Sequence, residues 1–342
     1  MLGRWGSLAL ATLALASCSG QSAPIRAAGS STVYPFTKAV AEAFAQAKPG
    51  RTAPVIESTG TQPGLMRFCE SSGAESFDVA DASRRMKRVE FDKCQANGVR
   101  EIIEIPIGLD GLALAESIDG PKLSLSRKDI YLALAASPSG KPNTAKTWKD
   151  VNPALPAIPI LVLGPPTTSG TRDAFVELIL LPGCLEAVPA AKEMKASGDP
   201  AAFSRLCRDI RTDGAYVVEG EDDTVIVKGL ARDPKALGLF GYSYLEQNAA
   251  RLRGVPIDGI APEYAAISGG KYPGGRTLYL YVKNEHLKQK PELLEFLNLY
   301  ASMWGPNGPL AKRGLIVMSE SARKRSAEAI KDGRPLEAAI LY

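Results

Sequence analysis

The sequence predicts an α/β fold with two domains. Short runs of aliphatic and β-branched residues alternate along the chain with segments whose apolar residues recur at helical spacing. A chain of 342 residues is long enough for about two domains, and a hydrophobic fraction of 45% with a charged fraction of 23% is that of an ordinary globular protein. We therefore expect two α/β lobes, each with a core of its own.

The strands and helices are predicted from periodicity and from the residues that end each segment. The segment VYPFTKAVAEAFAQA, for example, has apolar residues at helical spacing and stops at Pro49-Gly50. The predicted helices are residues 33–47, 64–70, 127–135, 172–181, 291–303 and 319–331. The predicted strands are residues 55–57, 78–80, 102–107, 112–114, 158–163 and 278–282.

The N-terminal residues 1–17 are predicted to be a secretory signal. Arg4 supplies the positive charge, and residues 7–16 (SLALATLALA) form an apolar stretch too short for a membrane span. The ending Leu-Ala-Ser-Cys18 resembles the lipobox of bacterial lipoproteins, in which the cysteine is acylated and becomes the first mature residue. An ordinary signal peptide cleaved nearby is the alternative. We expect residues 18–26 to be a polar tether that holds the exported protein to a membrane, in the periplasm or at the cell surface.

The four remaining cysteines predict two disulfides. They form an even set in an exported chain, where disulfides persist. Of the three possible connectivities we expect the local one, Cys69 with Cys94 and Cys184 with Cys207. A zinc site would need C-x-x-C or Cys/His spacing, which this sequence lacks. No metal and no other cofactor is therefore expected.

Composition and motifs argue against nucleic-acid binding and against catalysis. The net charge of +4 arises from Lys and Arg scattered among nearly as many acids, without a long basic run. A serine hydrolase would need a base beside its nucleophile, yet G-x-S-x-G is absent and the only histidine, His286, lies in a polar stretch that we expect at the surface. Walker A and G-x-G-x-x-G motifs are also absent. We expect a protein that is not an enzyme and has no catalytic residues.

Three loops combine glycine with small hydroxyl residues directly before a predicted helix. They are residues 29–32 (GSST), 58–61 (STGT) and 168–171 (TSGT). The start of a helix presents unpaired backbone N–H groups and a partial positive charge, so it can bind an anion without lysine. Each loop alone is most often a simple helix cap. The three together, in an exported chain, favour an anion site.

Six segments carry a family resemblance. Together they look like the phosphate-binding periplasmic proteins of phosphate ABC transporters, which are type II solute-binding proteins. The segments are residues 29–35 (GSSTVYP), 80–84 (ADASR), 110–113 (DGLA), 169–175 (SGTRDAF), 239–242 (LFGY) and the pair 271–273 (KYP) with 278–282 (LYLYV). They occur in order over most of the mature chain.

The resemblance implies the periplasmic-binding-protein fold. In that fold two lobes, each a mostly parallel sheet flanked by helices, are joined by a hinge of crossover strands. Residues 27–108 would form lobe 1, residues 109–262 lobe 2, and residues 263–342 would return to lobe 1. The resemblance further implies a monomer that binds inorganic phosphate in the cleft, closes over it by hinge motion, and passes it to the permease of an ABC importer in the membrane.

The resemblance also implies a set of phosphate-binding residues. They are Ser31, Thr32 and Thr61 in the first lobe, Ser169, Gly170 and Thr171 in the second, and Asp81, which matches the family's buried acid. A carboxylate in an anion site needs a proton on the ligand, which phosphate retains near neutral pH and sulfate lacks. Asp81 would thus reject sulfate. A helix cap or a surface ion pair is the other interpretation of Asp81.

This sequence departs from the family at one position. Better-known members carry an arginine shortly before Ser-Gly-Thr, where this chain has residues 164–168 (GPPTT). Arg172 and Arg84 are the candidates to supply the cation instead. The ligand is therefore less determined than the fold. The alternatives are a binding protein for molybdate, tungstate or sulfate, a phosphate-responsive sensor, and a surface lipoprotein that binds no small anion.

Overall fold

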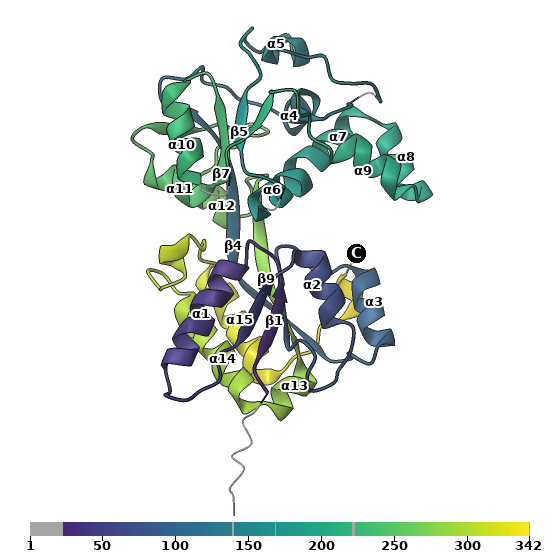
Figure 1. Cartoon of the computed structure of the whole chain (residues 1–342), viewed down its shortest axis with the longest axis vertical. Helices are drawn as coiled ribbons and strands as arrows, with labels where there is room; N and C mark the ends of the chain where they lie inside the picture. The colour runs from purple at the N-terminus through teal and green to yellow at the C-terminus, as the bar shows by residue number, and fades with distance from the viewer. Residues whose placement is uncertain (1–22, 139, 168, 221–222, 342) are drawn as a thin grey trace, which may run out of the picture.

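The protein consists of two lobes joined by two long strands. The computed structural model describes residues 23–138, 140–167, 169–220 and 223–341. Figure 1 shows the lobes one above the other, with β4 (Ile102–Ser117) and β9 (Gly275–Lys283) passing between them. Strand β4 pairs antiparallel with β9 in the lower lobe and with β7 (Leu237–Gly241) and β8 (Leu252–Gly254) in the upper lobe. The predicted α/β class, with a hinge of crossover strands, is confirmed.

The lower lobe is built on a mixed sheet with the strand order β2-β1-β3-β9-β4. Strand β1 (Arg26–Gly29) pairs in parallel with β2 (Val55–Ser58) and β3 (Val79–Ala82), and β9 returns antiparallel to β3. Parallel neighbours need a crossover, which helices provide here. The carboxyl ends of β1, β2 and β3 consequently lie at one edge of the sheet, which faces the upper lobe.

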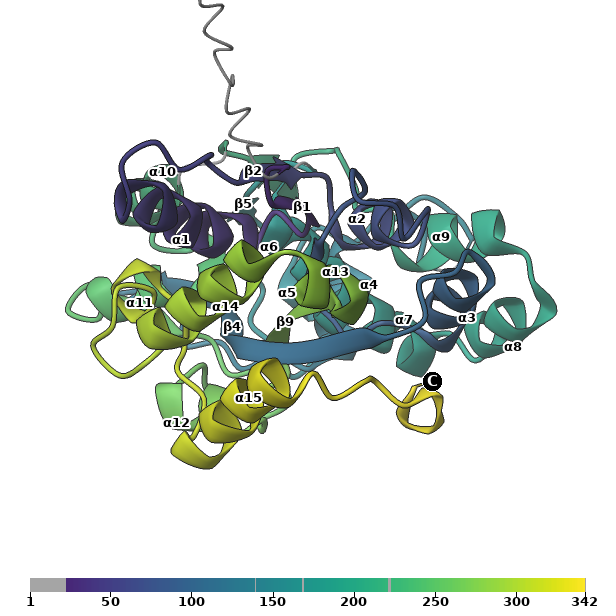
Figure 2. The same ribbon diagram turned by 90° about the horizontal axis from the view of Figure 1, so that it is seen from below.

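Helices cover both faces of the lower sheet. One face packs on α1, α14 and α15, and the other on α2 and α3, as the two views show (Figures 1 and 2). Helix α2 lies very close to β1, because a Cβ atom added to Gly64 would fall 2.3 Å from the Cα atom of Gly29. The helices of this lobe are α1 (Tyr34–Gln46), α2 (Thr61–Phe68), α3 (Arg88–Ala96), α13 (Asn284–Gln289), α14 (Pro291–Met303), α15 (Glu320–Asp332), η2 (Ala311–Arg313) and η3 (Ala338–Ile340).

The upper lobe continues the sheet in the order β4-β7-β5-β6. Strand β5 (Val162–Gly164) pairs in parallel with β6 (Tyr216–Val218) and β7. Its helical segments are α4 (Arg127–Leu134), α5 (Trp148–Val151), α6 (Gly170–Phe175), the π-helical turn η1 (Val176–Leu180), α7 (Leu181–Ala187), α8 (Ala190–Ser197), α9 (Pro200–Cys207), α10 (Asp223–Arg232), α11 (Tyr242–Gln247) and α12 (Tyr264–Ser268).

Some elements differ from the sequence-based expectation. The expected tether reaches residue 26, but Arg26 already begins β1. The two strands expected within residues 102–114 are one continuous strand, β4, with a register shift between Pro106 and Gly108. Residues 263–274 were expected to return to the first lobe, yet Ile267 and Tyr272 pack in the core of the second. These differences arise because long-range pairing, which local periodicity does not show, fixes where strands begin and end.

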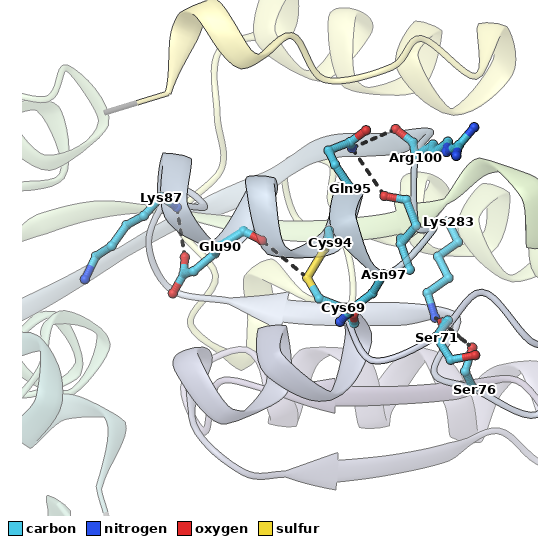
Figure 3. The surroundings of a disulfide bond; sticks show 11 residues. Cys69, Ser71, Ser76, Lys87, Glu90, Cys94, Gln95, Asn97, Arg100 and Lys283 are labelled. Carbon is cyan, nitrogen blue, oxygen red and sulfur yellow. Dashed lines mark hydrogen bonds between the residues drawn. A yellow bond between two sulfur atoms is a disulfide. The ribbon is translucent and has the colours of Figure 1, made fainter.

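The structure contains one disulfide in each lobe, and each joins two helical segments. Cys69 is bonded to Cys94 and Cys184 to Cys207, over sequence separations of 25 and 23 residues. The predicted local pairing is therefore confirmed. Figure 3 shows the first disulfide between α2 and α3, close to the loop that carries Ser71.

The prediction that His286 lies at the surface is wrong. Its side chain is fully buried, with Nδ1 2.6 Å from Oδ1 of Asp78 and Nε2 3.0 Å from the carbonyl oxygen of Ser72. The ammonium group of Lys290 donates to the same Asp78 oxygen over 2.8 Å. Burial opposes the charge of Asp78, but hydrogen bonds from His286, Lys290 and the backbone of Arg26 outweigh it and lower the pKa of Asp78. This cluster fastens α13 to the loop before β3.

Neither a membrane span nor a metal cluster is found in the described ranges. No single helix there is long and apolar enough to cross a bilayer. The helical segments 170–187 and 190–196 are together long and apolar enough, but the chain bends by 115° between them. The same ranges contain no group of three or more His, Cys, Asp or Glu side chains that could hold a metal ion.

Candidate functional site

Three loops of the lower lobe meet where the parallel strands end. The last residue of β1, Gly29, is level with Ser58 of β2 and Asp81 of β3, so the segments that follow are neighbours. The backbone N–H groups of Thr59 and Gly60 both donate to the carbonyl oxygen of Gly29 over 2.8 Å. In open α/β sheets ligands bind at the carboxyl ends of the strands. This edge is therefore the expected place for a ligand.

The hydroxyl group of Thr61, which follows β2, joins this loop to the segment that follows β3. Thr61 Oγ1 accepts a hydrogen bond from the backbone N–H of Ser83 over 3.1 Å and lies 3.0 Å from the Ser83 hydroxyl. In the first loop the backbone N–H of Thr32 donates to Ser30 Oγ over 3.2 Å. The hydroxyl groups of Ser31, Thr61 and Ser83 thus stand at the same edge of the sheet.

The upper lobe contributes the start of α6. Ser169 caps this helix, with its Oγ accepting from the backbone N–H of Thr171 over 3.2 Å, and is buried. Gly170 packs directly against the first loop, because a Cβ atom there would lie 2.2 Å from Thr32 Oγ1 and 2.7 Å from Ser31 Oγ. The two lobes are therefore in contact at the predicted site residues. Thr168, which begins the predicted loop, lies outside the described residues.

A buried arginine lies at the contact between the lobes, and the sequence analysis did not identify it. Arg276, on β9, is 7% exposed and pairs through Nε with Oδ2 of Asp110 on β4 over 3.2 Å. Its Nη2 donates to Thr32 Oγ1 of the lower lobe over 2.8 Å and to the carbonyl oxygen of Gly170 of the upper lobe over 3.1 Å. In the sequence, Arg276 lies between Gly274-Gly275 and the predicted strand 278–282. An arginine in that setting does not indicate a binding site.

A polar hollow of about 790 Å³ opens beside this contact, between the lobes. Its lower wall includes Thr61 and Ser83, and its upper wall includes Arg172. The remaining charged lining residues are Arg84, Lys87, Asp173, Glu177, Arg208 and Asp209. Such a wall, with hydroxyls and more than one arginine, can bind an anionic ligand.

The two arginines expected to replace the missing cation are both at this hollow, in different states. Arg84 forms a two-pronged ion pair with Glu90, over 2.9 Å and 2.7 Å, so much of its donor capacity is already used. Arg172 lies over the ring of Tyr216, 4.0 Å from the centroid, and its Nη1 is buried without a hydrogen-bond partner. Arg172 is thus the freer of the two.

Of the predicted site residues, Thr61, Arg84 and Arg172 line the hollow, whereas Ser31, Thr32, Ser169, Gly170, Thr171 and Asp81 do not. Asp81 lies within β3, fully buried, and its Oδ1 accepts a hydrogen bond from Thr37 Oγ1 of α1 over 3.0 Å. Burial raises the pKa of Asp81 to about 7, against the opposing effect of the Thr37 hydrogen bond. Ser83, the first residue after β3, lines the hollow.

Comparisons with known proteins place this architecture in a family. The sequence matches the PBP superfamily domain over residues 16–303. It is 30% identical to Protein SphX of Synechococcus elongatus over 290 residues, which cover 82% of this chain and 74% of that relative. It is 28% identical to the phosphate-binding protein PstS of Staphylococcus epidermidis over 314 residues, which cover 89% of this chain and 82% of that relative.

A solved structure agrees with these relatives. The crystal structure of a possible phosphate binding protein from Planctomyces limnophilus superimposes with a TM-score of 0.72 at 27% identity, covering 91% of this chain and 99% of that one. The family match extends across both lobes and includes every loop of the hinge contact. The chain belongs to the PBP superfamily of solute-binding proteins, together with SphX and PstS.

Proposed function

We propose that this protein binds inorganic phosphate between its lobes and delivers it to the permease of an ABC importer. It does so as an exported monomer that is held to the membrane by a lipid on Cys18 and that catalyses no reaction. Cys18 lies outside the described residues, so the anchor rests on the lipobox-like sequence alone.

The convergence of oxyanion donors at the hinge carries this proposal. Ser31, Thr32 and Thr61 come from the lower lobe, and the segment 169–171 comes from the upper lobe. Hydroxyls, backbone N–H groups at helix starts and a cation are the groups that bind phosphate oxygens in proteins. The names of the relatives support phosphate as the ligand, since PstS and the Planctomyces limnophilus protein are described as phosphate-binding.

The acids around the hollow bear on the choice between phosphate and sulfate. Phosphate keeps a proton near neutral pH and can donate it, whereas sulfate cannot, so an acceptor in the cleft favours phosphate. Asp173, two residues after Thr171, lines the hollow, and burial with the nearby charge of Glu177 raises the pKa of Asp173.

Calorimetric titration with phosphate, sulfate, molybdate and tungstate tests the ligand. We expect phosphate to bind at micromolar or lower Kd, and Thr61→Val to weaken it by roughly 10- to 100-fold if the hydroxyl bonds a charged ligand. The matched control is Thr144→Val at an exposed hydroxyl of the upper lobe, which should leave the affinity unchanged. Preferential binding of another oxyanion would refute phosphate, and no binding of any would refute the site.

Two further assays separate the remaining functions. Phosphate uptake should be restored by this protein in cells that lack their own binding protein, whereas a sensor would alter gene expression without restoring uptake. Incubation with a phosphomonoester should release no phosphate. Turnover above the background would contradict a binding protein that catalyses no reaction.

A further inference from the structure

Arg276 has a charged donor that no group among the described residues uses. Its Nε is paired with Asp110, and its Nη2 is paired with Thr32 and with the carbonyl oxygen of Gly170. Its Nη1 is buried and has no hydrogen-bond partner in the structure. A guanidinium group stays protonated in proteins, so this donor carries positive charge.

An unpaired charged donor in a protein interior is costly. Leaving a buried neutral donor without an acceptor costs about 1–3 kcal/mol, and a charged one costs more. Such groups are rare in native proteins, and each calls for an explanation such as a ligand. Asp110 does not provide an acceptor for Nη1, because its carboxylate accepts from Nε.

The described groups near the Arg276 guanidinium include the carboxylates of Asp110 and Asp173, yet no described group accepts a hydrogen bond from Nη1. Nη1 is bonded to the same carbon as Nη2, so it lies beside the Thr32 hydroxyl and the first residue of α6. The Ser31 hydroxyl also lies at this contact, 2.7 Å from the place that a Cβ atom added to Gly170 would take. An oxyanion is the ligand that brings several acceptor oxygens and no competing positive charge.

We propose that Arg276 supplies the cation of the binding site, its Nη1 donating to an oxyanion bound beside the contact of Thr32 with the start of α6. This rests on the proposed function and names the residue that takes the place of the arginine absent before Ser169. Arg276 lies on the hinge strand β9, and its guanidinium group contacts both lobes at once. Ligand binding and lobe closure are therefore joined at one side chain.

The position of Arg276 distinguishes it from Arg84 and Arg172, two of the three arginines that line the hollow. Arg84 is occupied by Glu90, and Arg172 is only half buried and stacked on Tyr216. Only Arg276 is more than nine-tenths buried and bonded to residues of both lobes. Because salt screens buried charges less than exposed ones, its attraction for the anion is the one that persists at physiological ionic strength.

Titration of four variants with phosphate tests the proposal. Loss of a hydrogen bond to a charged ligand predicts that Arg276→Gln weakens binding by roughly 10- to 100-fold, with Arg276→Lys intermediate because it keeps the charge without the second N–H prong. Asp110→Asn removes a negative charge beside the guanidinium, so phosphate should bind equally or more tightly. Arg253→Gln is the matched control, since Arg253 pairs across β4 with Glu116 over 2.8 Å, away from the cleft.

The control separates a ligand contact from a structural one. Each variant is first checked for folding by its urea midpoint and circular dichroism, and Arg276→Lys carries the test if Arg276→Gln does not fold. Arg253→Gln is expected to lower stability while phosphate affinity stays within about threefold of wild type. Arg276 variants that bind phosphate like wild type, or an Asp110→Asn loss as large as that of Arg276→Gln, would overturn the proposal.

The wild-type titration distinguishes the two proposals. Wild-type binding with an unaffected Arg276→Gln variant refutes the role of Arg276 and leaves the proposed function standing. Wild type that ignores phosphate but binds another oxyanion refutes phosphate, and the same variants are then titrated with that anion. Binding of no oxyanion refutes both.

Discussion

Replacing Asp81 by asparagine should flatten the dependence of stability on pH. The carboxyl group of Asp81 is fully buried, its Oδ1 accepts from Thr37, and its Oδ2 has no partner. The Thr37 hydroxyl also lies 3.3 Å from the hydroxyl of Tyr300. No charged group forms a hydrogen bond or ion pair with Asp81, so the folded protein disfavours its ionised form.

The magnitude follows from the shift of the pKa of Asp81 from 3.8 to about 7. Below about pH 3.8 the carboxyl group of Asp81 is protonated in both the folded and the unfolded protein, so its contribution to the free energy of unfolding is fully present. As the pH rises, the unfolded chain releases the proton first, and the free energy of unfolding falls until the folded state also ionises. At about 1.4 kcal/mol per pKa unit the loss is on the order of 4 kcal/mol, most of it between about pH 4 and pH 7.

Urea unfolding of the wild type and Asp81→Asn across this pH range measures the effect. The asparagine cannot ionise, so its curve should fall less steeply, and the difference between the two proteins should grow with pH. Curves that stay parallel would refute the assignment of the titration to Asp81. Titration of both proteins with phosphate and sulfate is the second measurement: if the hydrogen bond with Thr37 is the whole role of Asp81, the phosphate-to-sulfate preference changes by less than about threefold. Loss of that preference would show that Asp81 reaches the ligand after all.

Three other outcomes are expected. Gly170→Ala places a methyl group 2.2 Å from Thr32 Oγ1, so it should hold the lobes apart and weaken phosphate binding in calorimetry with little change in the urea midpoint; unchanged affinity would contradict the contact. Joint replacement of Cys69 and Cys94 by serine should lower the free energy of unfolding by about 3 kcal/mol, and an equal urea midpoint would contradict this. Cys18→Ser should release or stall the protein, and mass spectrometry that finds an unmodified mature N-terminus elsewhere would rule the anchor out.

The sequence alone determined the features that local chemistry controls. The loop 29–32 and the segment 169–171 were predicted at helix starts because Gly, Ser and Thr satisfy unpaired N–H groups there, and the structure places both at the contact between the lobes. The alternation of strands and helices predicted the α/β class, and the spacing of the cysteines in an exported chain predicted their pairing. The local features, which are the helix starts, the alternation and the cysteine pairs, depend on residues close in the chain, whereas the contact of residues 29–32 with residues 169–171 does not.

Only the tertiary structure decided which residues share the cleft. Asp81 and Ser83 are two residues apart, and the end of β3 between them separates a carboxyl under α1 from a hydroxyl in the hollow. Arg276 meets Thr32 and Gly170 because the antiparallel register of β4 and β9 sets it opposite Asp110, and no local pattern encodes that register. His286 is buried for the same reason, since its partner Asp78 lies far away in the chain. Local sequence fixes caps and turns through neighbouring atoms, whereas the pairing of distant strands fixes which charges meet.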